Sequence, residues 1–201
     1  MTKAVIFDVG RVLFQWDLCH LFSKLISDPD DLNWFVSTVI TPEWHFQSDA
    51  GRPLEEMIAE RRDEFPDHAW LIDAYAQRFV ETIPGPVEGM VELVEELFSL
   101  GTPLFIITNF GDEFWRDFRP TQPLFDLFSD ILVSGTEKLV KPDISIYQRA
   151  LDRFELTPES ALFIDDMPAN VTGALSIGIN SHQFIDAKTT RDWLVEQSVL
   201  G

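Results

Sequence analysis

Carboxylate, hydroxyl and amide side chains stand directly after short apolar runs at several places in this sequence. These residues are Asp8, Thr108, Asn109, Ser134, Asp165 and Asp166. If the runs are strands of a parallel sheet, the side chains after them meet in one crevice at its carboxyl edge. Three carboxylates in one crevice repel each other and favour a bound cation. Hard oxygen ligands without histidine or thiolate select Mg²⁺ rather than zinc, and such a site can hold a substrate phosphate.

The apolar runs that carry these side chains are short and rich in β-branched residues, which is typical of buried parallel strands. They are Ala4–Phe7, Leu104–Ile107, Ile131–Val133, Ala161–Ile164 and, more weakly, Ser181–Ile185. Apolar residues recur at helical spacing between them, in Met90–Phe98, Ile144–Phe154, Asn170–Ile177 and Thr190–Val199. Strands that alternate with helices predict an α/β fold with a doubly wound, mostly parallel, Rossmann-like sheet.

The long segment between the first two predicted strands breaks this alternation. Helical spacing recurs there in Leu18–Ile26, Leu54–Phe65 and Trp70–Phe79, and Thr41-Pro42 has the residue types of a helix start. Pro84-Gly85-Pro86 then marks a boundary. We therefore expect an α/β core formed by residues 1–15 and 85–201, with a helical cap, residues 16–84, inserted after the first strand.

Composition limits the classes of partner. The 201 residues include 34 acidic and 15 basic side chains, for a net charge of −19. This charge argues against nucleic acid and against an anionic membrane surface as partners. The single cysteine, Cys19, excludes an internal disulfide and a multi-cysteine zinc site. The apolar run at the N-terminus is too short for a signal peptide, and no run approaches a membrane span. We expect a soluble, cytoplasmic protein; the sequence does not indicate its oligomeric state.

Four motifs in a fixed order resemble the haloacid dehalogenase-like (HAD) hydrolase superfamily. They are Val-Ile-Phe-Asp8-Val-Gly10, Phe-Ile-Ile-Thr108-Asn109, Lys141-Pro142-Asp143, and Phe-Ile-Asp165-Asp166 with Asn170 after it. The resemblance covers essentially the whole chain. The helical insertion between the first two motifs is similar to the type-one cap of this superfamily.

The resemblance implies a role for each motif residue. Asp8 is implied as a nucleophile that forms an aspartyl-phosphate, which water then hydrolyses. The implied ligands of Mg²⁺ are Asp8, the carbonyl of Gly10, Asp166, and Asp165 directly or through water. Thr108 and the amide of Asn109 are implied to hydrogen-bond the phosphoryl oxygens, and Lys141 to pair with the phosphate and with Asp8.

Gly10 departs from the pattern of most phosphatases in the superfamily, which have a second aspartate there as general acid and base. An Asp-x-Gly first motif is similar to that of bacterial sugar-phosphate phosphatases. Without this acid, the rate is expected to rise steeply as the leaving group becomes more acidic, which favours a sugar 1-phosphate substrate. Asp17 and His45 are candidate replacements, although a helix cap for Asp17 and ordinary packing for His45 are the stronger explanations.

The predicted function is that of a Mg²⁺-dependent phosphatase acting on a small phosphorylated metabolite. Trp16, Trp44, His45 and Arg52 are the cap residues expected to contact the substrate. Two alternatives stay open at this point. A 2-haloacid dehalogenase would use the aspartate without a metal, and a catalytically impaired binding or regulatory protein would keep the same scaffold.

Overall fold

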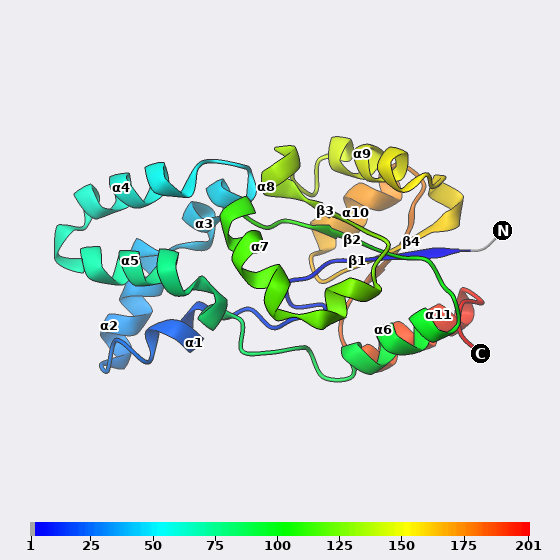
Figure 1. The fold of residues 1–201 in the computed structure, drawn as a ribbon, viewed down its shortest axis with the longest axis horizontal. Coiled ribbons are helices and arrows are strands. Elements are labelled where there is room, and N and C mark those ends of the chain that lie inside the picture. The colour runs from blue at the N-terminus through cyan, green and yellow to red at the C-terminus, as the bar shows by residue number, and fades with distance from the viewer. Residues whose placement is uncertain (1–2) are drawn as a thin grey trace.

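The computed structural model describes residues 3–201 and contains one parallel sheet (Figure 1). Its strands are β1 (Ala4–Phe7), β2 (Leu104–Thr108), β3 (Asp130–Val133), β4 (Ala161–Asp165) and β5 (Asn180–Gln183). The strand order is β3-β2-β1-β4-β5, and every pair is parallel. The α/β, doubly wound fold predicted from the sequence is confirmed.

The central strands are the most apolar because both of their faces are covered. All residues of β1, β2 and β4 are buried, whereas the edge strand β5 has none that is fully buried. In the register of the sheet, Phe7 lies opposite Ile106 of β2 and opposite Ile164 of β4. The residues that follow these positions therefore emerge side by side at the carboxyl edge of the sheet.

Helices cover the two faces of the sheet in separate layers. The helices of the core are α6 (Met90–Ser99), α7 (Asp112–Phe118), α8 (Ser134–Glu137), α9 (Ile144–Phe154), α10 (Pro168–Ser176) and α11 (Ala187–Glu196). Figure 1 shows α9 and α10 on one face and α6 with α11 on the other. Helix α6 ends before Gly101, whose φ of 74° lies in the left-handed region that glycine tolerates.

The segment between β1 and β2 is helical. It carries α1 (Leu18–Phe22), α2 (Pro29–Trp34), α3 (Pro42–Asp49), α4 (Leu54–Glu64) and α5 (Ala69–Arg78). Figure 1 shows these helices grouped at the end of the molecule away from the C-terminus. Helix α3 begins as the sequence predicts, because the Thr41 side chain accepts a hydrogen bond of 3.1 Å from the Trp44 amide and Pro42 follows it. We call these helices the cap.

Aromatic side chains join the cap to the core. Phe79, just after α5, stacks on Phe114 of α7 with ring centroids 3.9 Å apart, and it meets Phe110 edge-on at 5.7 Å. Tyr75 of α5 also contacts Phe114, at 5.2 Å. One hydrophobic cluster therefore runs from the sheet into the cap. The boundaries at residues 15–16 and 84–85 stay a prediction.

Three helices, α2, α7 and the four-residue α8, have no counterpart in the sequence analysis, and one is shorter than expected. Helix α2 buries none of its residues, so it has no apolar stripe to reveal it; Asp28 caps it and Pro29 begins it. Helix α7 buries only Phe114 and Phe118. Helix α1 ends at Phe22 rather than near residue 26. Within residues 3–201, none of the helices combines the length and the apolar character that crossing a bilayer requires.

Candidate functional site

Three carboxylates converge at the carboxyl edge of the sheet. Asp8 follows the central strand β1, and Asp165 and Asp166 stand at the end of the adjacent strand β4. One carboxylate oxygen from each of the three lies within 4.8 Å of the others. Asp8 and Asp165 are buried, and Asp166 is half-buried. The parallel register therefore brings together residues that lie more than 150 positions apart in the sequence.

Lys141 supplies a positive charge to this cluster. Its Nζ lies 2.7 Å from Asp8 Oδ1 and 2.7 Å from Asp165 Oδ2, and it donates a third bond of 3.0 Å to the carbonyl oxygen of Ile107. Its side chain is only 1% exposed. All three protons of the ammonium therefore have protein acceptors, and the flexible lysine stem is held in one position.

Asp165 uses both of its oxygens within the protein. Oδ2 accepts the bond from Lys141, while Oδ1 accepts bonds of 2.9 Å from the Met167 amide and from the Asn170 side chain. Tyr147 in turn donates a bond of 2.8 Å to the carbonyl oxygen of Asn170. Asp165 is thus anchored on every side, whereas Asp166 is left more accessible at the mouth of the cluster.

The loop that carries Lys141 is fastened to the end of β2. The Asn109 side chain donates to the carbonyl oxygen of Lys141 at 3.0 Å and accepts from the Lys141 amide at 2.9 Å. On the other side, α10 approaches this loop so closely that a Cβ added at Gly173 would lie 2.6 Å from the Pro142 carbonyl oxygen. The main-chain position of Lys141 is therefore fixed from two directions.

Burial and mutual repulsion shift the ionisation of the cluster. Burial raises the pKa of Asp8 to about 7, with Asp165 and Asp166 adding to the increase and Lys141 opposing it. Burial, with the charge of Asp165, also raises the pKa of Asp166. Burial alone would lower the pKa of Lys141, but the charges of Asp165 and Asp8 outweigh it, so that pKa is raised. The ammonium therefore stays charged at neutral pH.

The donor set of this cluster fits a hard divalent cation. When ionised, three carboxylates against one ammonium leave two negative charges without compensation, and the ligand atoms are all oxygens. Asp8 and Asp166 have accessible oxygens, while both oxygens of Asp165 are already engaged. Charge and ligand chemistry together match Mg²⁺.

Thr108 ends strand β2 and Gly10 follows strand β1, next to the carboxyl edge of the sheet. Thr108, the last residue of β2, is fully buried, and its Oγ1 has no hydrogen-bond partner within residues 3–201. A buried hydroxyl of this kind is suited to a bound oxyanion. Gly10 lies outside the left-handed region, and a Cβ built on it would meet nothing within 4 Å. The position could therefore carry a side chain.

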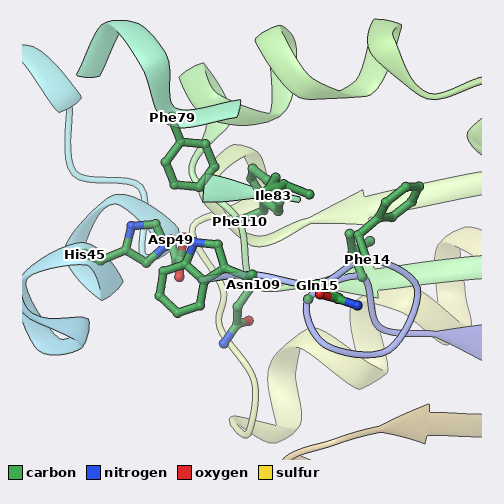
Figure 2. A pocket seen from close by; sticks show the side chains of 11 residues that line it. Phe14, Gln15, His45, Asp49, Phe79, Ile83, Asn109 and Phe110 are labelled. Carbon is green, nitrogen blue, oxygen red and sulfur yellow. Dashed lines mark ion pairs between the residues drawn. The ribbon is translucent and has the colours of Figure 1, made fainter. Parts of the chain in front are cut away.

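A small pocket opens between this edge and the cap. It has a volume of about 120 Å³ and is lined by eleven residues, most of them apolar or aromatic. In Figure 2, His45 and Asp49 reach it from α3, while Asn109 and Phe110 reach it from the loop after β2. Gly10 contributes to the same lining. The pocket thus connects the predicted catalytic edge with the cap.

The predicted cap residues divide into two groups. His45 lines the pocket, as does Trp16, whose ring stacks on His45 with centroids 4.9 Å apart. Trp44 and Arg52 do not line it. Trp44 is buried against Tyr75, with ring centroids 5.4 Å apart, and Arg52 pairs with Glu60 and with Gln47.

The structure also adds residues that the sequence analysis did not select. Asn170 and Tyr147 support Asp165, and Asp49 and Phe79 line the pocket. Asn170 stands within the fourth motif, five residues after Asp165, and its place in that motif was an available signal. Asp49 had no such signal, because it is the last residue of a cap helix whose position over the core depends on tertiary packing.

Comparison with known proteins finds a family model and relatives that cover most of the chain. The sequence model of the family described as haloacid dehalogenase-like hydrolase matches residues 38–183. A sesquiterpene phosphatase of Aspergillus oryzae is 26% identical over 194 residues, covering 94% of this chain and 92% of the relative. A phosphoglycolate phosphatase of Thiobacillus denitrificans is 24% identical, covering 88% of this chain and 80% of the relative.

The fold also matches a solved structure. A HAD family enzyme of Bacteroides thetaiotaomicron, crystallised with magnesium and inorganic phosphate, superposes with a TM-score of 0.71. It is 16% identical, and the match covers 92% of this chain and 96% of that one. At this level of identity the likeness extends to the fold alone.

Proposed function

The chain belongs to the haloacid dehalogenase-like hydrolase family, and from this premise we propose that it is a Mg²⁺-dependent phosphomonoesterase for a small phosphorylated metabolite. The observation that carries the proposal is the cluster of Asp8, Asp165 and Asp166 around one buried ammonium, with a pocket beside it. The phosphatases among its relatives support the same reaction class.

Asp8 is the proposed nucleophile. Lys141 holds its Oδ1, which leaves the other carboxylate oxygen to attack the phosphorus atom and form an aspartyl-phosphate. Mg²⁺ held by Asp8, Asp166 and the carbonyl of Gly10 would neutralise phosphate oxygens, so that a carboxylate can approach a dianion. Asp165 acts on Lys141 rather than on the substrate, because both of its oxygens are engaged.

The remaining groups of the edge are proposed to bind the phosphoryl oxygens. The Thr108 hydroxyl is buried and lacks a partner within the described residues, which suits it to donate to an oxyanion. The Asn109 side chain is occupied by the main chain of Lys141, so its proposed contact with phosphate is made by its backbone amide. Lys141 completes this set with its positive charge.

The two alternatives predict different behaviour in the same assay. A dehalogenase needs no metal, and its aspartate attacks a carbon atom. Three converging carboxylates would then repel each other with no bound cation to offset their charge. An impaired binding protein would bind a phosphate ester without turning it over. Hydrolysis of phosphate esters that depends on Mg²⁺ would exclude both, and its absence across a broad panel would refute the proposed function.

The pocket also bears on the class of substrate. Its lining is mainly apolar, with Phe14, Trp16, Phe79, Ile83 and Phe110 among its members. This surface favours an ester whose leaving group has an apolar or planar part, although a sugar 1-phosphate, as predicted from the first motif, stays a candidate. A panel that pairs sugar phosphates with aryl and alkyl phosphates of similar size distinguishes the two.

Asp166→Asn is expected to raise the Mg²⁺ concentration for half-maximal activity by at least about tenfold, because it removes the charge of the most accessible ligand. Chelation of the metal should abolish turnover by the wild-type enzyme, and added Mg²⁺ should restore it. Titration of kcat/KM with Mg²⁺ measures both effects. Asp152→Asn, an exposed change on α9, is the matched control. An unchanged metal requirement in Asp166→Asn would remove this residue from the proposed site.

Trp16→Ala is expected to raise KM for the best ester of the panel by about tenfold, at little change in kcat, because it removes apolar contact within the pocket. Arg52→Ala is the comparison, since its guanidinium pairs with Glu60 and Gln47 outside the pocket. Steady-state kinetics on both variants separates the two positions. An equal rise in KM for both would support the role predicted for Arg52 from the sequence.

A further inference from the structure

Asp49, the last residue of α3, carries a buried carboxyl with one unpartnered oxygen. It is 6% exposed, and its Oδ1 makes no hydrogen bond within residues 3–201. The nearest basic nitrogen to that oxygen is His45 Nε2, at 3.6 Å, which is beyond hydrogen-bond distance. A buried polar atom without a partner calls for an explanation, and a ligand or a catalytic role is one.

The surroundings of Asp49 place it beside the proposed reaction centre. It lines the same pocket as Gly10 and Asn109, and Figure 2 shows its side chain together with that of Asn109. Its carbonyl oxygen accepts a bond of 2.6 Å from the hydroxyl of Ser134, the residue that follows β3 at the carboxyl edge of the sheet. The end of α3 is therefore fastened to the core.

The environment of Asp49 favours its protonated form. Burial raises the pKa of the Asp49 carboxyl, against smaller opposing effects of His45, the Gly111 backbone and Lys141. The groups facing it are His45 on the same helix, Tyr75 on α5 and Lys141 in the core. Burial therefore disfavours the charged form of this carboxyl, and a raised pKa near the reaction centre makes a carboxyl better suited to donate a proton.

We propose that Asp49 is the general acid and base of the reaction, placed on the cap in the role that the side chain missing at Gly10 would otherwise fill. This inference rests on the proposed phosphatase function and concerns the same site. It differs from the expectation drawn from the sequence, in which Gly10 leaves the leaving group without a positioned acid.

The proton balance closes over the two steps. In the first, Asp8 forms a bond to phosphorus, the bond from phosphorus to the ester oxygen breaks, and Asp49 Oδ1 gives its proton to that oxygen. An alcohol leaves, and Asp49 becomes a carboxylate. In the second, water attacks the aspartyl-phosphate while Asp49 takes a proton from it. Inorganic phosphate and the Asp8 carboxylate are released, and Asp49 is again protonated.

His45 is a positioning residue in this proposal. Its ring lies between Trp16, at 4.9 Å, and Phe79, at 5.6 Å, and its Nδ1 bonds to the hydroxyl of Tyr75. These contacts leave Nε2 facing Asp49. His45 therefore limits where the carboxyl can turn, and it lies close enough to stabilise the carboxylate formed after proton donation.

The test measures kcat/KM with Mg²⁺ for a series of phosphate esters whose leaving groups differ in pKa. The wild-type enzyme is expected to show a shallow dependence on leaving-group pKa, and Asp49→Asn a steep one. The variant should lose about 10²–10⁴-fold on alkyl phosphates and little on para-nitrophenyl phosphate. Glu43→Gln, an exposed change on the same helix, is the matched control.

Gly10→Asp provides a second variant, because a Cβ at this position meets nothing within 4 Å. Combined with Asp49→Asn, it should return activity on alkyl phosphates and flatten the dependence again. That rescue would not follow if Asp49 only held the cap to the core, since the double variant would keep the same defect in packing.

The outcomes separate the inference from the function on which it rests. If the wild-type enzyme hydrolyses no phosphate ester with Mg²⁺, the proposed function fails. If it hydrolyses para-nitrophenyl phosphate but its dependence on leaving-group pKa is already steep, the role of Asp49 alone is refuted. An equal loss on every ester in a folded Asp49→Asn protein also refutes it. A steep wild-type slope refutes the role of Asp49 even if the variant does not fold.

Discussion

Asp8→Asn is expected to reduce hydrolysis of every phosphate ester to background while the protein still folds. The change removes the attacking oxygen and the charge of one metal ligand, and it keeps the shape of the side chain. The melting temperature at pH 8 should be no lower than that of the wild type. The reason is that burial raises the pKa of Asp8 to about 7, so its ionised form opposes folding above that pH.

Activity assays at saturating Mg²⁺ and thermal melts without Mg²⁺ measure the two parts of this expectation. Asp152→Asn, on the exposed face of α9, controls for the loss of one carboxylate from an acidic protein. Turnover above a few per cent of the wild-type value in Asp8→Asn would contradict the covalent mechanism. A melting temperature far below the wild type would show that Asp8 supports the fold.

Lys141→Met is expected to abolish activity and to lower the free energy of unfolding by about 3–5 kcal/mol at pH 8. The ammonium is 1% exposed and lies 2.7 Å from both Asp8 and Asp165. Its removal leaves two buried carboxylates without their positive partner, and breaking a buried pair in this way costs energy of that order. Denaturant titration of the metal-free protein gives the difference directly.

The loss of unfolding free energy in Lys141→Met, relative to the wild type, should become smaller as the pH falls from 8 to 5.5. The folded-state pKa of Asp8 is about 7, above its ordinary value of 3.8, so its ionisation opposes folding as the pH rises through 7. At pH 5.5 Asp8 is largely protonated, and less unpaired charge remains buried. Lys138→Met, which changes a lysine three positions away, is the control. A small loss of unfolding free energy at pH 8 would contradict this expectation, because it would mean that the buried carboxylates are stable without the ammonium of Lys141.

The sheet and the carboxylate cluster at its edge were predictable because their signals are local in sequence. Ala4–Phe7 and Ala161–Ile164 are unbroken apolar runs that end on aspartates, and a buried parallel strand requires such a run on both of its faces. The register that sets Phe7 opposite Ile164 then follows from the fold class. The proximity of Asp8 and Asp165 is a consequence of this topology.

The residues that line the pocket were less predictable, because they depend on how the cap lies over the core. Trp44 and His45 are neighbours on α3, yet Trp44 packs into the cap while His45 lines the pocket. The direction of each side chain is set by the rotation of one short helix, which the sequence pattern does not determine. Asp49, one turn after His45, was overlooked for the same reason.

The stacking of Phe79 on Phe114 has a consequence for the timing of catalysis. A substrate larger than the pocket of about 120 Å³ would fit only if the cap moved away from the core, and separating these rings would expose apolar surface that their contact buries. That cost would favour the closed arrangement of cap and core. If substrate bound only to an open arrangement, its apparent affinity would fall in proportion to the open fraction, and the contact between Phe79 and Phe114 would help to set that fraction.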